Sequence, residues 1–316
     1  MHAIAVRVAM TWLAALWSIG ASPAAAQPCD GVQIEIGASE QRCLKPGLGQ
    51  PFKDCRDCPE MVVVPAGSFV MGATLDEEVA SPREDQVRVA IAGPFAVGRF
   101  AVTRGEFAAF VASTGHKMDG DCYRLAEPKR EAGRNWRSPG FAQDDRHPVV
   151  CVNWNDARAY AAWISSITGK NYRLLSETGR EYVTRAGSVT PFWWGSTIST
   201  EQANYNGNIT HGGGAKGEWR KATVAVDSFS ANPWGLYNVH GNVWEWTEDC
   251  WNDKNAGNPR DGGPRITGDC SLRVVRGASF NNFPHTLRAA RREREPLGSR
   301  VDAVGFRVMR SLGVEN

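Results

Sequence analysis

Residues 241–250 read GNVWEWTEDC, in which Glu245 stands between Trp244 and Trp246. Successive side chains of an extended chain point to opposite faces, so the two tryptophans would share one face and Glu245 would lie on the other. A carboxylate in so aromatic a stretch is expected to be partly buried. A buried carboxylate needs a cation or several hydrogen-bond donors, or it stays protonated. The partner of Glu245 therefore depends on the residues around this stretch.

The first 26 residues have the pattern of a secretory signal peptide. Arg7 precedes an apolar run from Val8 to Ile19, and an A-x-A cleavage site ends before Gln27. The alternative is a membrane anchor, but the run is short and alanine-rich for a bilayer span. No second apolar run of spanning length follows. We expect cleavage after residue 26 and a periplasmic or secreted protein with no membrane span.

The rest of the chain predicts one large domain. The formal net charge of the 316 residues is +2, which gives no electrostatic argument for binding nucleic acid or an anionic membrane. No Pro/Ser linker, charge block or clear internal repeat follows residue 60. We expect a cysteine-containing N-terminal extension at residues 27–59 and a single domain at residues 60–312.

The chain has 8 cysteines, all beyond the predicted leader. An even count in an exported chain indicates disulfides. Pairing sequence neighbours gives four local loops: Cys29–Cys43, Cys55–Cys58, Cys122–Cys151 and Cys250–Cys270. Cys55 and Cys58 could instead form a redox CxxC, but the strand-then-helix context of such a motif is missing. No Cys/His set has the spacing of a zinc finger.

The local patterns predict few regular elements. We expect strands at Met61–Pro65, Phe69–Met71, 273–279 and 305–309. We expect helices from the capping box at Thr103 to Gly115, from about Asp156 to Gly169, and from near Ser176 to Gly187. Long loops rich in Gly, Asn and Trp follow the third helix. This pattern is typical of an α+β domain with much irregular chain.

Several motifs in order resemble the formylglycine-generating enzyme, or sulfatase-modifying factor, family. They are MVVVPAGSFVMGA (61–73), HPVVCVNWNDARAYAAWIS (147–165), YRLLSETGREYVTRAG (172–187), NPWGLYNVHGNVWEWTED (232–249), RVVRGASF (273–280) and VGFRV (304–308). The resemblance implies a modified C-type-lectin-like α+β fold, low in regular secondary structure and here stabilised by disulfides. One departure lies at Gly179 and Arg180, where the family commonly has an acid and a tryptophan.

The resemblance also implies structural calcium. In these enzymes the stretch around Glu245 binds calcium, and the ligands correspond to the Asn238 side chain, the Gly241 and Val243 carbonyls and the Glu245 carboxylate. Calcium prefers such oxygen ligands. The alternative is a glutamate held by backbone N–H groups or an arginine without metal. A second family site corresponds to Asn204 and the Tyr205 carbonyl, with further ligands near Glu218 and Arg220.

The catalytic copper of the family is not expected here. True formylglycine-generating enzymes hold copper with two cysteines shortly after the RGGS motif, because thiolates suit Cu(I). This chain has RGAS at 276–279 followed by FNNFPHTLRAAR at 280–291, with no cysteine after Cys270. Asn282 and Leu287 stand near the expected thiol positions. Formylglycine generation by the copper/cysteine route is therefore not expected.

Two hypotheses remain for the function. The first is an exported oxidase or modifying enzyme for a peptide or peptide-derived substrate, similar to a family relative that is a periplasmic oxidase maturing the pyoverdine chromophore. The second is a noncatalytic recognition module that uses the same groove. The groove is expected to be lined by Ser279, Asn281, Asn282, His285 and Arg288. His285 could act as a base, although a lone loop histidine is more often simply solvated or hydrogen-bonded.

Overall fold

The computed structural model describes residues 28–312, apart from 38, 75–76, 78 and 125–132. The predicted leader at residues 1–26 lies outside the described residues. Within them, no helix is both long and apolar enough to cross a membrane.

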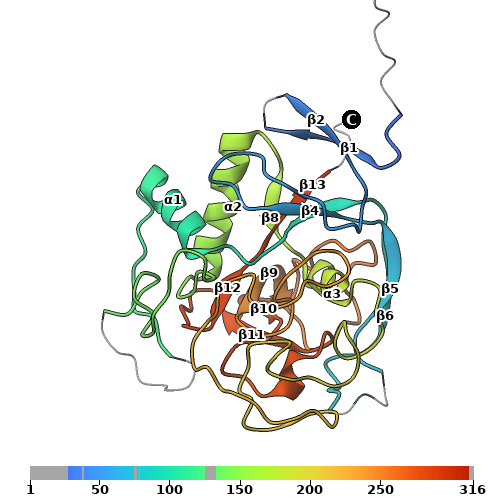
Figure 1. Cartoon of the computed structure of the whole chain (residues 1–316), viewed down its shortest axis with the longest axis vertical. Coiled ribbons are helices and arrows are strands. Elements are labelled where there is room, and N and C mark those ends of the chain that lie inside the picture. The colour runs from blue at the N-terminus through green and yellow to red at the C-terminus, as the bar shows by residue number, and fades with distance from the viewer. Residues whose placement is uncertain (1–27, 38, 75–76, 78, 125–132, 313–316) are drawn as a thin grey trace, which may run out of the picture.

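Strands and short helices alternate with long irregular segments (Figure 1). The helices are α1 (Arg104–Thr114), α2 (Trp154–Thr168), α3 (Glu177–Arg185) and the 3₁₀ helix η1 (Pro284–Leu287). One sheet has the order β11-β10-β9-β12, made of Arg292–Pro296, Asp269–Arg276, Trp244–Trp251 and Val304–Phe306. A second has the order β3-β4-β7-β13-β8, made of Pro51–Phe52, Met61–Val64, Phe95–Gly98, Val308–Ser311 and Tyr172–Leu174. Two hairpins complete the described strands: β1 (Val32–Ile36) with β2 (Glu40–Leu44), and β5 (Gly67–Met71) with β6 (Val87–Ile91).

Helices α1 and α3 begin where the sequence predicts, and α2 begins slightly earlier. Thr103 and Glu106 form the expected capping box of α1, and Gly115 ends it in the left-handed conformation. The second helix begins two residues before the expected Asp156, because Asn153 caps it and Asp156 completes a second capping box. Ser176 caps α3, which ends slightly before the expected Gly187.

Strand β9 lies between two partners and carries the GNVWEWTEDC stretch into the interior. It pairs antiparallel with β10 and parallel with β12. Trp244, Glu245 and Trp246 are all buried, so both faces of the strand are covered. The alternation of faces holds, but the face opposite the tryptophans is buried rather than exposed to solvent.

The main hydrophobic core fills the space between the sheets and helices α1 and α2. Phe107 of α1 packs edge-on against Trp136 at 5.3 Å and Phe306 at 6.3 Å between ring centroids. Tyr160 of α2 packs against Phe306 at 5.3 Å. A second cluster of buried apolar side chains lies between β4–β7 and α3. Figure 1 shows α3 on the side of β5 and β6, away from α1 and α2.

The expected strands are confirmed only in part. Met61–Val64 and Gly67–Met71 agree with the prediction. The strand expected at 273–279 instead runs from Asp269 to Arg276, and the one expected at 305–309 is broken at Arg307 into β12 and β13. Strand β9 is not among the expected strands, and its parallel partner β12 is about sixty residues further along the chain.

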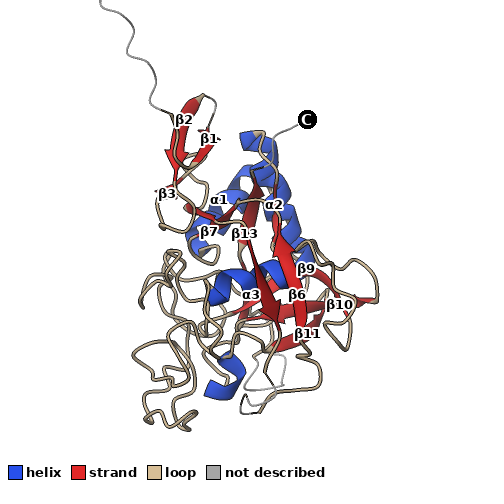
Figure 2. Ribbon diagram, turned by 90° about the vertical axis from the view of Figure 1, so that its right-hand side faces the viewer, coloured by secondary structure: helices blue, strands red, loops and turns tan. Residues whose placement is uncertain are grey.

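All four predicted disulfides are present: Cys29–Cys43, Cys55–Cys58, Cys122–Cys151 and Cys250–Cys270. The structure has no free cysteine. Cys55–Cys58 lies in the N-terminal extension, whose β1–β2 hairpin lies at one end of the molecule (Figure 2). The extension joins the domain through β3, which pairs with β4.

Candidate functional site

The Glu245 carboxylate is held by two arginines. Arg180 of α3 donates from Nε to Oε2 at 2.6 Å, and Arg307 donates from Nη2 to Oε1 at 2.9 Å. The Nε of Arg307 also lies 3.2 Å from each carboxylate oxygen. All three side chains are buried. Burial alone would raise the pKa of Glu245, but the charges of Arg180 and Arg307 and their hydrogen bonds hold it below its usual value.

The first expected calcium set does not fit a calcium ion in this arrangement. Both Glu245 oxygens already accept hydrogen bonds from guanidinium groups. The Gly241 carbonyl accepts the N–H of Val243 at 2.9 Å. Asn238 Oδ1 is buried without a hydrogen-bond partner, while its Nδ2 donates to the Val226 carbonyl at 2.9 Å. Of the expected Asn238, Gly241 and Glu245 ligand oxygens, only Asn238 Oδ1 accepts no hydrogen bond, and Glu245 is held by arginines, as in the alternative arrangement without metal.

In the second expected calcium set, the acidic residue Glu218 does not point at a shared site with Asn204. Asn204 is buried, and its Nδ2 donates to the Ala222 carbonyl at 2.9 Å. The Glu218 side chain is 66% exposed and pairs with Arg220 at 3.4 Å. Among the described residues, no group of three or more His, Cys, Asp or Glu side chains could hold a metal ion. Calcium at Asn204 and Tyr205 stays a prediction.

Ser279 lies in a closed turn rather than on an open groove. Its side chain is buried, and its Oγ–H donates to Asn282 Oδ1 at 2.7 Å. The same oxygen accepts the Ser279 N–H at 2.9 Å. Asn282 is fixed in turn because its carbonyl accepts the N–H of Asn206 at 2.9 Å. This geometry favours a structural role for the serine hydroxyl over a nucleophilic one.

Arg288 does not line the expected groove, which corrects the prediction. Its guanidinium is buried and donates to Glu77 at 2.6 Å and to Glu84 at 2.9 and 3.1 Å. Burial alone would lower the pKa of Arg288, but the bonds and charges of Glu84 and Glu77 raise it. The two acids attract the side chain into the interior, away from solvent.

His285, Asn281 and Asn282 are the members of the expected groove that are partly exposed. The Asn281 Nδ2 atom is nevertheless buried without a hydrogen-bond partner. The His285 ring lies 6.2 Å from the Phe283 ring, and Phe283 is 44% exposed. His240, in the turn before β9, is instead buried, with its Nδ1 2.6 Å from the Leu287 carbonyl. Burial lowers the pKa of His240 to about 3, so it is neutral and packs as expected.

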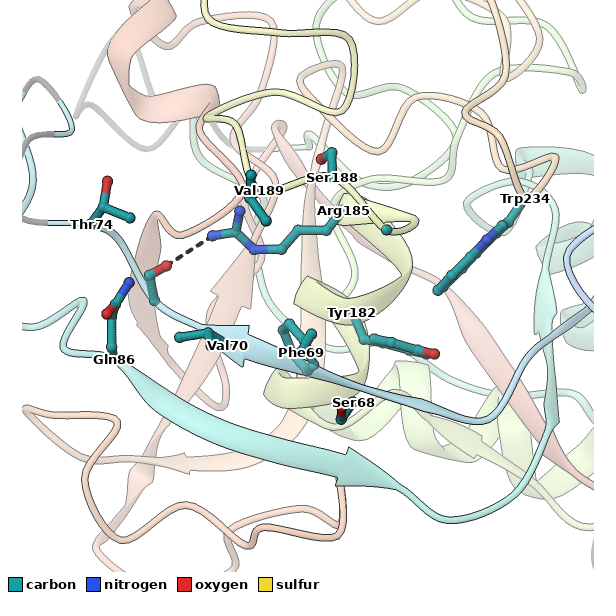
Figure 3. A pocket seen from close by; sticks show the side chains of 12 residues that line it. Ser68, Phe69, Val70, Thr74, Gln86, Tyr182, Arg185, Ser188, Val189 and Trp234 are labelled. Atoms are coloured by element: carbon teal, nitrogen blue, oxygen red, sulfur yellow. Dashed lines mark hydrogen bonds between the residues drawn. The ribbon is translucent and has the colours of Figure 1, made fainter.

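A cavity of about 370 Å³ that the sequence did not indicate lies beside β5 and the end of α3 (Figure 3). Its walls include Phe69, Tyr182 and Trp234, with ring centroids 5.2 Å apart for the first two and 4.8 Å for the last two. Arg185 also lines it, but its guanidinium bonds Glu181 at 2.8 Å and the Gly72 carbonyl at 2.9 Å. The cavity therefore offers aromatic surface and little unpaired charge. Its three aromatic residues belong to three separate sequence motifs, which explains why spacing alone could not locate it.

The chain is similar to known proteins along most of its length. A family model described as "Sulfatase-modifying factor enzyme 1-like domain" matches residues 48–312. The chain is 34% identical over 292 residues to a formylglycine-generating enzyme of Thermomonospora curvata, covering 78% of this chain and 92% of that protein. It is 28% identical over 309 residues to an inactive C-alpha-formylglycine-generating enzyme 2 of Bos taurus, covering 86% and 92%.

A solved structure shares the fold over most of this chain. It is the structure of PvdO from Pseudomonas aeruginosa, with a TM-score of 0.75 and 40% sequence identity, covering 84% of this chain and 99% of that chain. The modified C-type-lectin-like α+β fold expected from the motifs is thereby confirmed.

Proposed function

The chain belongs to the sulfatase-modifying factor family, and from that premise we propose that it is an exported modifying enzyme, an oxidase, acting on a peptide or peptide-derived substrate. The proposal excludes formylglycine formation by the copper/cysteine route.

The state of the cysteines carries this proposal. Each of the chain's 8 cysteines is accounted for by the four disulfides. Copper(I) would need thiolates, and a disulfide sulfur is a poor substitute for one. The loop after Ser279, where the family places its thiols, has Asn282 held by hydrogen bonds instead. The family scaffold is therefore retained while its copper ligands are missing.

The same disulfides support export. Disulfides persist in the periplasm and outside the cell and are rare in reducing cytoplasm. Together with the leader pattern at residues 1–26, they support a periplasmic or secreted location.

The aromatic cavity is our candidate for the substrate site. Phe69, Tyr182 and Trp234 offer ring faces on which an apolar or aromatic group can stack (Figure 3). The exposed Val189 at its rim adds apolar surface. Such a site suits one side chain or ring of a peptide-derived molecule better than a highly charged ligand.

Comparative metabolite analysis tests the proposal. An oxidase removes two electrons and two protons from its substrate and passes them to dioxygen. A strain lacking the gene should accumulate an exported peptide-derived compound that is two hydrogens heavier than the product of the complemented strain. Purified protein should convert that compound in air, whereas Trp234→Ala should raise KM strongly and Ile167→Ala, on the exposed side of α2, should not. Formation of an aldehyde from a sulfatase-derived cysteinyl peptide, with copper bound, would overturn the proposal.

A noncatalytic recognition module is the second candidate. The burial of Arg288 and the closed turn at Ser279 favour it, because neither side chain is free to react. The similarity to a relative named as inactive points the same way. This function predicts binding of the accumulated compound without conversion.

A further inference from the structure

Helix α3 is buried along its whole length, yet it carries charged side chains at Glu177, Arg180, Glu181 and Arg185. Buried charges are stable only when they are paired. The N-cap Ser176 starts the helix so that Arg180 faces strand β9 and reaches Glu245. The resemblance implies a tryptophan at the position of Arg180 in many members of the family, so the cation here is a departure from that pattern.

The Arg180 guanidinium joins Glu245 to the turn before β9. Its Nε donates to Glu245 Oε2 at 2.6 Å, and its Nη2 donates to the Val239 carbonyl at 3.0 Å. Its Nη1 donates to Thr184 Oγ1 on the same helix. The Arg180 guanidinium thus contacts both the Glu245 carboxylate and the turn before β9, which were expected to bind a calcium ion.

The neighbouring backbone leaves room for this guanidinium. Gly277 has φ +97°, and a Cβ on it would lie 2.7 Å from Arg180 Nη2. An alanine there would be strained in backbone conformation and would also collide with the arginine. The glycine and the arginine therefore fit each other.

The charges around Glu245 oppose a further cation. Arginines outnumber glutamates in this buried network, and Arg307 already neutralises Glu245 from the other side. The arginines are Arg180, Arg185, Arg276, Arg292 and Arg307, and the glutamates are Glu177, Glu181 and Glu245. A divalent ion beside Arg180 and Arg307 would meet two like charges where little water screens them.

We propose that Arg180 is a built-in cation that takes the place of calcium at Glu245, and that the fold at this site is independent of calcium. Arg180 and a calcium ion are alternative partners of the carboxylate. Asn238 Oδ1, which is buried without a hydrogen-bond partner, is the remaining feature of a cation site. When the Arg180 guanidinium is removed, Glu245 Oε2 loses its 2.6 Å donor, and this carboxylate oxygen and Asn238 Oδ1 are the two atoms that a metal would use. This inference does not depend on the proposed enzymatic activity.

Calcium titrations of purified variants test it. The wild type should show the same Tm in chelator and in millimolar calcium. Arg180→Ala should have a lower Tm in chelator and should gain several degrees with calcium chloride, but less with magnesium chloride. Arg180→Lys, which keeps the positive charge, should not respond to calcium.

Arg310→Ala is the matched control. Arg310 is also a buried arginine paired with a carboxylate, Asp54, at 2.7 Å, but it lies away from Glu245. This variant should lose stability without any calcium response. If the wild type and Arg180→Ala respond equally to calcium, the proposal is overturned. If Arg180→Ala does not fold, the wild type and Glu245→Gln are compared in chelator and in calcium. A wild-type Tm that falls in chelator, together with a Glu245→Gln Tm that is lower and does not respond to calcium, overturns the proposal. A wild-type Tm that is the same in chelator supports it.

Discussion

Arg288 is a surface-like residue in the sequence and a core residue in the structure. Its partners Glu77 and Glu84 are separated from it by more than two hundred positions. A run of arginines and glutamates usually indicates a solvated segment, so the local pattern favours exposure. Only the tertiary fold brings the acids to it. The same applies to Glu245, whose partners Arg180 and Arg307 lie 65 and 62 positions away.

Arg288→Met should destabilise the protein by about 3–5 kcal/mol, because it leaves Glu77 and Glu84 buried without their cation. Denaturant unfolding at pH 7 measures this change. Arg294→Gln is the control, since Arg294 is partly exposed and pairs with Asp253 at 3.7 Å. It should change the free energy of unfolding by less than about 1 kcal/mol. Equal effects of the two substitutions would contradict the structural role of Arg288.

The titration of Asp249 makes the stability of the folded protein depend on pH. Burial, with the nearby charge of Glu177, raises the pKa of Asp249 to about 7, although its carboxylate accepts the N–H of Glu177 at 2.7 Å and of Arg265 at 2.8 Å. In the unfolded chain its pKa is about 3.9. The folded state therefore binds more protons between about pH 4 and 7, and this contribution to stability falls as the pH rises through that window.

Asp249→Asn should remove that slope, which amounts to at most about 1.4 kcal/mol per pH unit. The measurement is the free energy of unfolding of both proteins from pH 4.5 to 7.5. The free energy of unfolding of the wild type minus that of the variant should decrease as the pH rises and become constant above the folded pKa of Asp249. A difference that is constant over the window would show that Asp249 titrates normally.

The helices and disulfides, which close locally, could be predicted, whereas strand β9 and the aromatic cavity, which depend on long-range contacts, could not. The Thr103–Glu106 capping box spans three residues, and α2 has a local apolar period that ends at Gly169, so both helices could be recognised from sequence. Strand β9 depends on β10 and on the parallel β12, which is about sixty residues further along the chain. The disulfides were predictable because each joins cysteines that are neighbours in sequence order. The aromatic cavity was not, because β5, α3 and Trp234 meet only after folding.

The N-cap of helix α1 can be tested by substitution of Thr103. The Thr103 side chain accepts the N–H of Glu106 at 3.1 Å, and Glu106 Oε2 accepts the N–H of Thr103 at 2.8 Å. Thr103→Ala should cost about 1 kcal/mol of stability, because one N–H of the first turn loses its partner. Thr103→Ser keeps the oxygen and should remain within about 0.5 kcal/mol of the wild type. Thermal unfolding distinguishes them, and an equal loss in both would assign the effect to the threonine methyl group.

At the scale of the molecule, the N-terminal extension is packed as part of the domain. Ile34, Ile36, Leu44 and Phe52 belong to the main hydrophobic cluster. Asp54 accepts hydrogen bonds from Arg310 at 2.7 and 2.8 Å and another from the Tyr172 hydroxyl. The family match begins at residue 48, before the domain start expected at residue 60. A boundary drawn at residue 60 would therefore cut through the buried contacts of β3 and Asp54.

Deleting residues 28–59 should abolish stable folding or lower Tm sharply. The deletion uncovers part of the core and leaves Arg310 buried without Asp54, and breaking such a pair alone costs about 3–5 kcal/mol. Asp54→Asn separates the two causes, because it removes the charge but keeps the apolar contacts, and it should account for part of the loss. Lys45→Gln is the control, since Lys45 pairs with Asp30 at the surface and its side chain is 50% exposed. Circular dichroism and denaturant unfolding follow all three variants. A deletion variant as stable as the wild type would mean that the extension only rests on the domain, and residues 60–312 would then fold alone.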